Sequence, residues 1–220
     1  MCGRYTLATP AELIGEHFDL PDPPALEPRY NIAPSQETLI IGSGDERRAA
    51  GLARWGLTVR HRSAPSSRLL INARIETVDR KPTFKEAVAR RRCLVPADGF
   101  YEWRREHTIK QPIFFSLSGG HVFAFAGIWN RPDDDDEPVR FAILTTRPNT
   151  TVESTHSRMP VIVRPSDYEQ WLEQRSLTRE ELERFATPYS ADDMTSWPVS
   201  RLVNSPAHDV PACTAPIGTS

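Results

Sequence analysis

The sequence has few cysteines and no long apolar run, and both shortages exclude whole classes of protein. Its three cysteines, Cys2, Cys93 and Cys213, stand far apart among 220 residues. This spacing forms neither a disulfide framework nor a zinc-binding signature. The chain starts without the basic and apolar segments of a signal peptide, and no apolar run is long enough to span a membrane. We therefore expect a soluble, cytoplasmic protein without membrane association.

An excess of charge of one sign is missing as well. The net charge is −2, so no bulk basic field attracts nucleic acid, and any polyanion must be bound by a local group of arginines. There is no internal repeat and no recognisable linker. Twenty prolines and five tryptophans favour a fold rich in strands and rigid turns.

The order of the expected elements indicates the fold class. Strands are interrupted by helices without a βαβ rhythm, which favours a single α+β domain over residues 1–220. We expect a mostly antiparallel sheet or open, barrel-like core flanked by helices. The compact part should cover about residues 2–204, and the Pro-, Ala- and Thr-rich tail over 205–220 should be irregular.

Two helix starts carry capping signals. Thr9 is expected to cap a helix that has Pro10 at its first position and Glu12 placed for a capping box. Thr178 and Glu181 form a second capping box further along the chain. The sequence therefore predicts a helix after each of these threonines.

Two apolar segments on either side of a glycine pair predict a β-hairpin. Residues 113–117 and 122–129 flank Gly119-Gly120, and adjacent glycines suit the tight turns that need positive φ. The polar stretch 58–68 has no such pattern, and we expect it to be a mobile surface loop.

The second residue offers an unusual combination of reactive groups. Cys2 follows the start methionine, whose removal is normally efficient before a small residue. The mature chain would then carry an α-amine with a pKa of about 7.7–8.0 beside a thiol with a pKa of about 8.5. Such an aminothiol condenses with an aldehyde to an imine, and the thiol then closes a five-membered thiazolidine. On this residue alone, the alternative that Cys2 is an accident of the start site stays open.

Three further polar residues stand at predicted strand ends and could serve this chemistry. Glu102 could deprotonate the α-ammonium group, His156 could shuttle a proton, and Asn72 could position the cysteine backbone. Each has a plainer interpretation: a solvent-facing carboxylate, a surface histidine and a turn former. Spacing alone does not show that these residues meet.

Three arginines accompany these residues. Arg4, Arg74 and Arg158 each lie two residues from a candidate catalytic residue. Arginines bind phosphate through bidentate, charge-assisted hydrogen bonds, so the three could bind a nucleic-acid backbone. They could equally form ion pairs with Asp or Glu.

At these stretches the sequence resembles the SOS-response-associated peptidase family, the abasic-site-processing proteins that crosslink to DNA. The similar segments appear in the family's order, cover residues 2 to about 165 and have a weaker echo in LVNSP near the end. They are MCGRYTL, RYNIAPSQ, RWGL, INARIETV, RRCLVPADGFYEW, FAFAGIW, TTRPN and HSRMPVIV.

The resemblance implies a fold of that family and a defined reaction. A mature N-terminal cysteine, here Cys2, attacks the ring-opened aldehyde of an abasic site in single-stranded DNA and ends as a thiazolidine crosslink. Asn72 would orient the cysteine and the sugar, Glu102 would be the acid/base group, and His156 would assist imine chemistry and crosslink reversal. The same site would remove Met1 autocatalytically. The imine also makes β-elimination, an AP-lyase reaction, chemically possible.

The resemblance also implies how DNA is bound. The three arginines named above would line the phosphate path, and Pro34 and Trp55 would meet a base, although core packing is the alternative for Trp55. The expected partner is single-stranded DNA with abasic sites, bound by a monomer that associates with the nucleoid and needs no metal or cofactor. Where family members continue WGL into Ile-Pro-x-Trp, this chain has residues 58–61, Thr-Val-Arg-His, so the preference for DNA junctions is open.

Two other functions remain as alternatives. An N-terminal-nucleophile amidohydrolase or peptidase would also use Cys2 with a nearby base, but would turn over an amide and need no DNA. A non-catalytic module for single-stranded DNA would keep its behaviour after Cys2→Ala. Reaction with aldehyde-containing DNA separates both from the main hypothesis.

Overall fold

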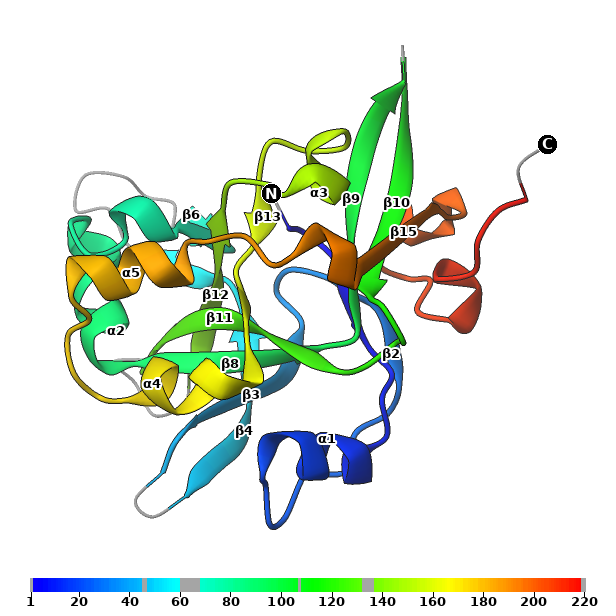
Figure 1. Ribbon diagram of the computed structural model, residues 1–220. Coiled ribbons are helices and arrows are strands. Elements are labelled where there is room, and N and C mark those ends of the chain that lie inside the picture. Colours follow the sequence, from blue (N-terminus) through cyan, green and yellow to red (C-terminus); the bar gives the residue numbers. More distant parts are fainter. Residues whose placement is uncertain (1, 45–46, 60–67, 107, 132–136, 219–220) are drawn as a thin grey trace.

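Two β-sheets form most of the computed structural model (Figure 1). The structure describes the chain except for residues 1, 45–46, 60–67, 107, 132–136 and 219–220. The first sheet is antiparallel throughout, in the order β15-β10-β9-β1-β2. Its strands are β1 (Tyr5–Leu7), β2 (Arg29–Ile32), β9 (Gly99–Glu106), β10 (Ile109–Leu117) and β15 (Met194–Pro198).

The second sheet has eight strands and is ring-like without being a barrel. Its order is β13-β12-β4-β3-β8-β11-β14, with β7 on β12, and a further pairing of β11 with β12 closes the ring. Among the residues that the structure describes, only the pairings of β12 with β4 and β7 are parallel, so the predicted α+β class with a mostly antiparallel sheet is confirmed. The strands are β3 (Glu37–Ser43), β4 (Arg48–Trp55), β7 (Asn72–Arg74), β8 (Arg92–Ala97), β11 (Phe123–Asn130), β12 (Arg140–Thr146), β13 (Met159–Pro160) and β14 (Ile162–Val163).

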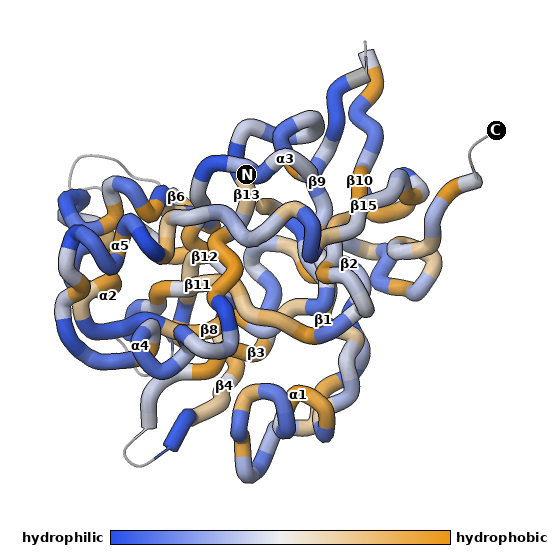
Figure 2. The backbone as a smooth tube through the Cα atoms, viewed as in Figure 1, coloured by the Kyte–Doolittle hydropathy of each residue, from blue (hydrophilic) through white to orange (hydrophobic). Residues whose placement is uncertain are grey.

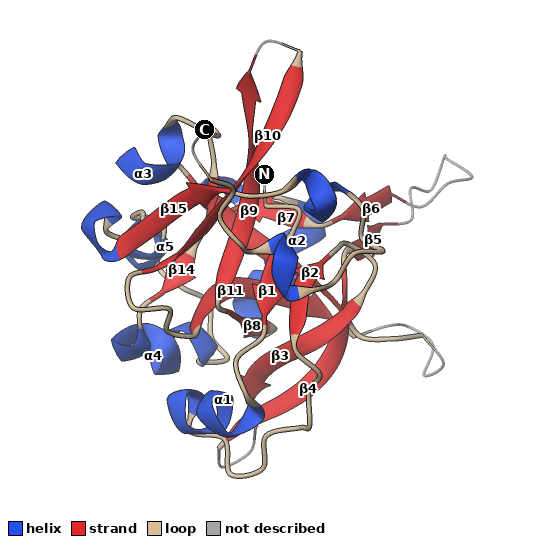
Figure 3. Ribbon diagram, turned by 90° about the vertical axis from the view of Figure 1, so that its right-hand side faces the viewer, coloured by secondary structure: helices blue, strands red, loops and turns tan. Residues whose placement is uncertain are grey.

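Helices and a small third sheet surround these strands (Figure 3). Helices α2 and α4 pack on β8. The helices are α1 (Ala11–Phe18), α2 (Pro82–Arg90), α3 (Thr150–Glu153), α4 (Tyr168–Leu172) and α5 (Arg179–Phe185). Single 3₁₀ turns span Ile75–Thr77, Pro165–Asp167, Ala191–Asp193, Arg201–Asn204 and Pro211–Cys213. The third sheet pairs β5 (Leu57–Val59) with β6 (Arg68–Leu70), so both ends of the predicted loop 58–68 are strand, and its centre lies outside the described residues.

The core lies where the strands of the large sheet cross the middle of the molecule (Figure 2). Every residue of β8 is buried, as are the first six of β11, the continuous burial typical of strands covered on both faces. Aromatic contacts join the two sheets, because Tyr5 of β1 packs edge-on against Trp55 and Phe125 at centroid distances of 5.2 and 5.7 Å. No helix among the described residues is long and apolar enough to cross a membrane.

The predicted hairpin around Gly119-Gly120 is wrong. Both glycines have positive φ, 85° and 68°, so the turn itself exists. However, β10 pairs with β9 and β15, whereas β11 pairs with β8, β12 and β14. The turn passes the chain from one sheet to the other, and the hairpin is formed by β9 and β10.

The first predicted helix forms, but its predicted cap is wrong. Pro10, not Thr9, is the N-cap of α1, and no side chain caps the helix. The Thr9 backbone and hydroxyl both donate to Asp98, at 2.9 and 3.1 Å, so Thr9 is held beside Asp98, one residue before the N-cap. The second capping box is confirmed, because Thr178 and Glu181 bond each other's backbone at the start of α5.

The segment after β15 is bound to β2. The carboxylate of Asp209 accepts the backbone N–H of Asn31 at 2.9 Å and is paired with Arg29. In return, the Asn31 amide donates to the carbonyls of Val203 and His208 at 3.2 and 2.7 Å. These contacts hold residues near 204 beside the start of β1.

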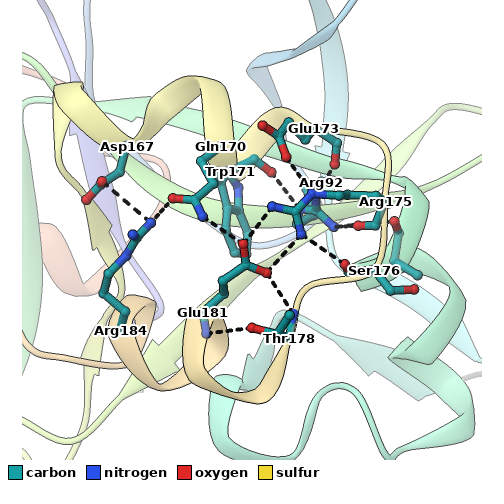
Figure 4. Close-up of polar contacts among 11 residues, drawn as sticks. Arg92, Asp167, Gln170, Trp171, Glu173, Arg175, Ser176, Thr178, Glu181 and Arg184 are labelled. Atoms are coloured by element: carbon teal, nitrogen blue, oxygen red, sulfur yellow. Dashed lines mark hydrogen bonds and ion pairs between the residues drawn. The ribbon is translucent and has the colours of Figure 1, made fainter.

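A buried arginine joins two helix ends (Figure 4). Arg92 is only 3% exposed, and burial lowers its pKa to about 10, so it stays charged at neutral pH. Its guanidinium caps the C-terminal carbonyls of α2 and α4, groups that have no partner within their own helices. The acceptors are the backbone carbonyls of Val88, Ala89, Trp171, Glu173 and Arg175.

Candidate functional site

Cys2 lies just before β1, where strand pairing brings it to β9. The N–H of Tyr101 donates to the carbonyl of Arg4 at 3.0 Å, which extends the pairing of β1 with β9 towards Cys2. The Cys2 side chain is fully buried, and its thiol lies 3.8 Å from the same carbonyl. Burial, and secondly the charge of Glu102, raise the pKa of this thiol well above its usual range. The thiol is therefore protonated at neutral pH as long as it is covered.

Asn72, the first residue of β7, holds the cysteine backbone. Its side-chain N–H donates to the Cys2 carbonyl at 2.8 Å, and the parallel pairing of β7 with β12 fixes its position. The amide oxygen on the same group is buried and accepts no hydrogen bond from the described residues. Asn72 therefore keeps a spare acceptor beside the cysteine.

Glu102 and His156, the two predicted acid/base residues, lie close together. Glu102 lies on β9 and is 3% exposed. His156 follows α3, and its Nδ1 lies 3.9 Å from a carboxylate oxygen of Glu102. Burial raises the pKa of the Glu102 carboxyl, and the positive form of His156 opposes this shift. Nδ1 also lies 3.0 Å from both the backbone N–H and the carbonyl oxygen of Arg158, so the backbone of Arg158 holds the imidazole in place.

The pair opens onto a surface depression of about 460 Å³. Its lining residues are Arg4, Glu102, Trp103, Lys110, His156 and Asn204. Cys2 does not line it but lies buried next to Glu102. Among the described residues, no group of three His, Cys, Asp or Glu side chains could hold a metal ion.

Comparison with known proteins identifies the family of this chain. The sequence model of the SOS response associated peptidase (SRAP) family matches residues 1–206. The chain belongs to this family.

Two named proteins and a solved structure are similar to this SRAP chain. It is 38% identical to the abasic site processing protein YoqW of Bacillus subtilis, over 96% of this chain and 97% of that one. It is 31% identical to the abasic site processing protein YedK of Escherichia coli, over 93% and 95% of the two chains. A solved structure from Bacteroides thetaiotaomicron covers 98% of this chain and all of its own, with 24% identity and a TM-score of 0.79, and shows the same fold.

The three arginines of this SRAP protein occupy different environments. Arg74 is exposed on β7. Arg4 is half-buried at the rim of the depression and donates to the carbonyls of Gly3 and Asn204, at 3.1 and 3.3 Å. Arg158 is bound in a bidentate ion pair with a carboxylate, so only Arg4 and Arg74 present their side chains at the surface without an ionic partner among the described residues.

The ion pair of Arg158 has a positioning effect. Its guanidinium donates to Glu76 at 2.6 and 2.9 Å and also to the backbone of Thr145. The pKa of Glu76 is lowered overall, because the Arg158 hydrogen bond and charge outweigh the effect of burial. Since the Arg158 backbone also bonds His156, this pair fixes the imidazole.

The two residues expected to meet a base differ in exposure. Trp55 is fully buried, and its indole N–H donates to the Ile71 carbonyl at 2.9 Å, so the core-packing alternative describes its position. Pro34 is partly exposed and precedes Ser35, whose φ is 72°. The structure thus brings Pro34, but not Trp55, to the surface.

Three residues that line the depression were not predicted from the sequence. Trp103 donates its indole N–H to the side chain of Asn204 at 2.7 Å. Trp103 lies in the GFYEW stretch and Asn204 in the LVNSP echo, so both had a weak signal. Lys110 lies on the partner strand of β9 and had none.

Proposed function

We propose that this protein reacts covalently with abasic sites in single-stranded DNA through Cys2, and so shields the lesion during the DNA damage response. The observation that carries the proposal is a chain of contacts between four separate segments of the chain: Asn72 holds the Cys2 backbone, the charge of Glu102 acts on the buried Cys2 thiol, and Glu102 lies beside His156. Glu102 and His156 line the depression. The names of the relatives support the choice of an abasic site as substrate.

The chemistry follows from the groups present. After loss of Met1, the α-amine of Cys2 adds to the C1′ aldehyde of the open sugar, and loss of water from the carbinolamine gives an imine. The thiol then adds to the same carbon, forming a C–S bond and returning a proton to nitrogen, which closes the thiazolidine. Glu102, with its raised pKa, gives the proton that lets water leave. His156 moves protons to and from the sugar oxygen.

Asn72 would hold the nucleophile in position for these reaction steps. Its N–H already fixes the Cys2 carbonyl, and its spare amide oxygen would accept a hydrogen bond from the α-amine or the sugar. Such positioning replaces a bimolecular encounter by a reaction between groups already in place.

The first test is denaturing electrophoresis, with intact mass, of the protein mixed with single-stranded DNA that carries one abasic site. We expect an adduct that survives denaturant, requires the abasic site and is lost in Cys2→Ala. Undamaged DNA of the same sequence is the control. No adduct from protein whose mass shows loss of Met1 would overturn the proposal and favour the amidohydrolase.

The family's description as a peptidase supports a second role for the same residues, removal of Met1 by the protein itself. Glu102→Gln should then retain Met1, because the base that activates the nucleophile is lost. Intact mass of wild type and Glu102→Gln, purified from the same host, measures this directly. Equal removal of Met1 in both proteins would assign the step to a host aminopeptidase instead.

A further inference from the structure

Strands β9 and β10 continue beyond the sheet as a two-stranded ribbon. β1 pairs with β9 only at Gly99 and Phe100, and β15 pairs with β10 only over residues 113–117. The β9–β10 ladder continues outward to the pair Glu106 and Ile109. Figures 1 and 3 show this ribbon projecting away from the rest of the molecule. An isolated two-stranded ribbon is only marginally stable in water, so this one depends on the contacts at its base.

The base of the ribbon is one wall of the candidate site. Glu102, Trp103 and Lys110 all lie on it and line the depression. The hydrogen bond from Trp103 to Asn204 fixes it on one side. The Gln111 amide, which donates to the Val199 carbonyl at 2.9 Å, fixes it on the other strand. A strand of nucleic acid leaving the depression on this side would follow the ribbon.

The outer part of the ribbon carries an unfavourable pair of charges. Arg105 and Lys110 are directly opposite each other in the ladder, and both are exposed. Like charges in this arrangement destabilise a two-stranded ladder. Within the described part of the chain, neither side chain forms an ion pair that would relieve the repulsion. An external anion would relieve it.

The same face of the ribbon also offers an aromatic ring. Side chains two residues apart on a strand share a face, so Trp103 lies on the face of Arg105 and of its cross-strand partner Lys110. Trp103 is partly exposed. Proteins bind single-stranded nucleic acid with cationic side chains that contact the phosphates and with aromatic rings on which the bases stack.

We propose that the β9–β10 ribbon binds the DNA strand that flanks the abasic nucleotide, with Lys110 at the depression and Arg105 further out on the phosphate backbone. The proposal rests on the proposed function for its choice of DNA. It adds a binding surface that the candidate catalytic residues and Arg4, Arg74 and Arg158 do not include. It also explains how a chain with a net charge of −2 attracts a polyanion locally.

The test uses undamaged single-stranded DNA, because binding to it needs no Cys2 chemistry. Arg105→Gln/Lys110→Gln is compared with wild type and with Lys85→Gln/Arg90→Gln, which removes the same charge from exposed positions of α2. The dissociation constant is measured by fluorescence anisotropy over a range of salt concentrations. Each lost phosphate contact should flatten the dependence of log K on log salt by about 0.7 for single strands. The ribbon variant should therefore lose about 1.4 in slope, and the α2 variant should match wild type.

Several outcomes would overturn the proposal. They are an unchanged slope in the ribbon variant, an equal loss of slope in both variants, and stronger binding of an acidic peptide than of DNA. Thermal melting tests whether the ribbon variant is folded. Because the substitutions remove the repulsion, the melting temperature of this variant should be at least that of wild type. If it is lower, the single variant Arg105→Gln replaces the double variant in the binding measurement. A wild type that forms no abasic-site adduct but keeps the ribbon-dependent slope would refute the proposed function and leave the ribbon proposal standing.

Discussion

Replacing Glu102 by glutamine should slow formation of the abasic-site adduct by about 10²- to 10⁴-fold, the usual contribution of a general acid or base, while making the protein more stable at neutral pH. Glutamine keeps the size of the side chain but cannot give or take the proton. It also removes a carboxyl group that burial disfavours in its charged form. The rate is measured as adduct formed per unit time under single-turnover conditions, after an added methionine aminopeptidase has removed Met1 from wild type and from Glu102→Gln, as checked by intact mass.

The gain in stability should depend on pH. In the unfolded chain, Glu102 has a pKa of about 4.3, and burial raises this value in the folded protein. Well below pH 4.3 both states are protonated, so the carboxyl group costs nothing. As the pH rises, the unfolded state ionises first, and wild type loses stability until the folded pKa is passed. Melting temperatures of wild type and Glu102→Gln should therefore coincide near pH 3 and diverge above about pH 4.

The opposite pattern would contradict this account. If Glu102→Gln melts below wild type at neutral pH, the carboxylate is charged and stabilised by a partner. Glu76→Gln provides the matched comparison, because the pKa of Glu76 is lowered by its pairing with Arg158. That substitution should reduce stability at neutral pH, and the reduction should disappear as the pH falls through the folded pKa of Glu76.

Arg92→Met should destabilise the protein strongly. Methionine fills similar space but leaves five buried or half-buried backbone carbonyls without their donor. A buried acceptor left without its donor costs about 1–3 kcal/mol, so the loss of these bonds should cost about 3–5 kcal/mol in total. For a domain of this size, each kcal/mol lowers the melting temperature by about 2–4 °C, so a fall of about 10 °C is expected in calorimetry.

A neighbouring arginine supplies the control. Arg175 forms ion pairs with Glu173 and Glu181 in the same cluster (Figure 4), but its side chain is 45% exposed. Exposed ion pairs contribute little to stability because water and salt screen them, so Arg175→Met should change the melting temperature little. If the two variants lost equal stability, the hydrogen bonds of Arg92 to the helix ends would not be the reason why Arg92 stabilises the protein.

Much of the candidate site could be predicted from short motifs, but its assembly could not. Cys2, Asn72, Glu102 and His156 were identified by residue type and by resemblance. Their meeting depends on strand pairings such as Tyr5 with Phe100, which no local pattern encodes. The DNA-binding residues were harder for the same reason: whether an arginine is at the surface or bound to a carboxylate, as Arg158 is, depends on the tertiary fold.

The wrong predictions for local structure have a common cause. Gly119-Gly120 has the right conformation for a hairpin, and Thr9 the right residue type for a cap. In both cases a distant partner competes: β9 takes the place of β11 beside β10, and Asp98 takes the hydroxyl of Thr9. The β9–β10 ribbon was not predicted for the same reason, because residues 113–117 of β10 were expected to pair with residues 122–129 and not with β9.

The position of β1 has a consequence for the order of events during synthesis. Cys2 is translated before β9, which pairs with the strand that Cys2 precedes, and long before Asn204, whose backbone carbonyl accepts a hydrogen bond from Arg4. At about 5–20 residues per second, many seconds pass before the last of these partners exists. The proposed nucleophile is therefore made well before its surroundings are complete, so under the proposed function a nascent chain should not react with DNA until translation has passed Asn204.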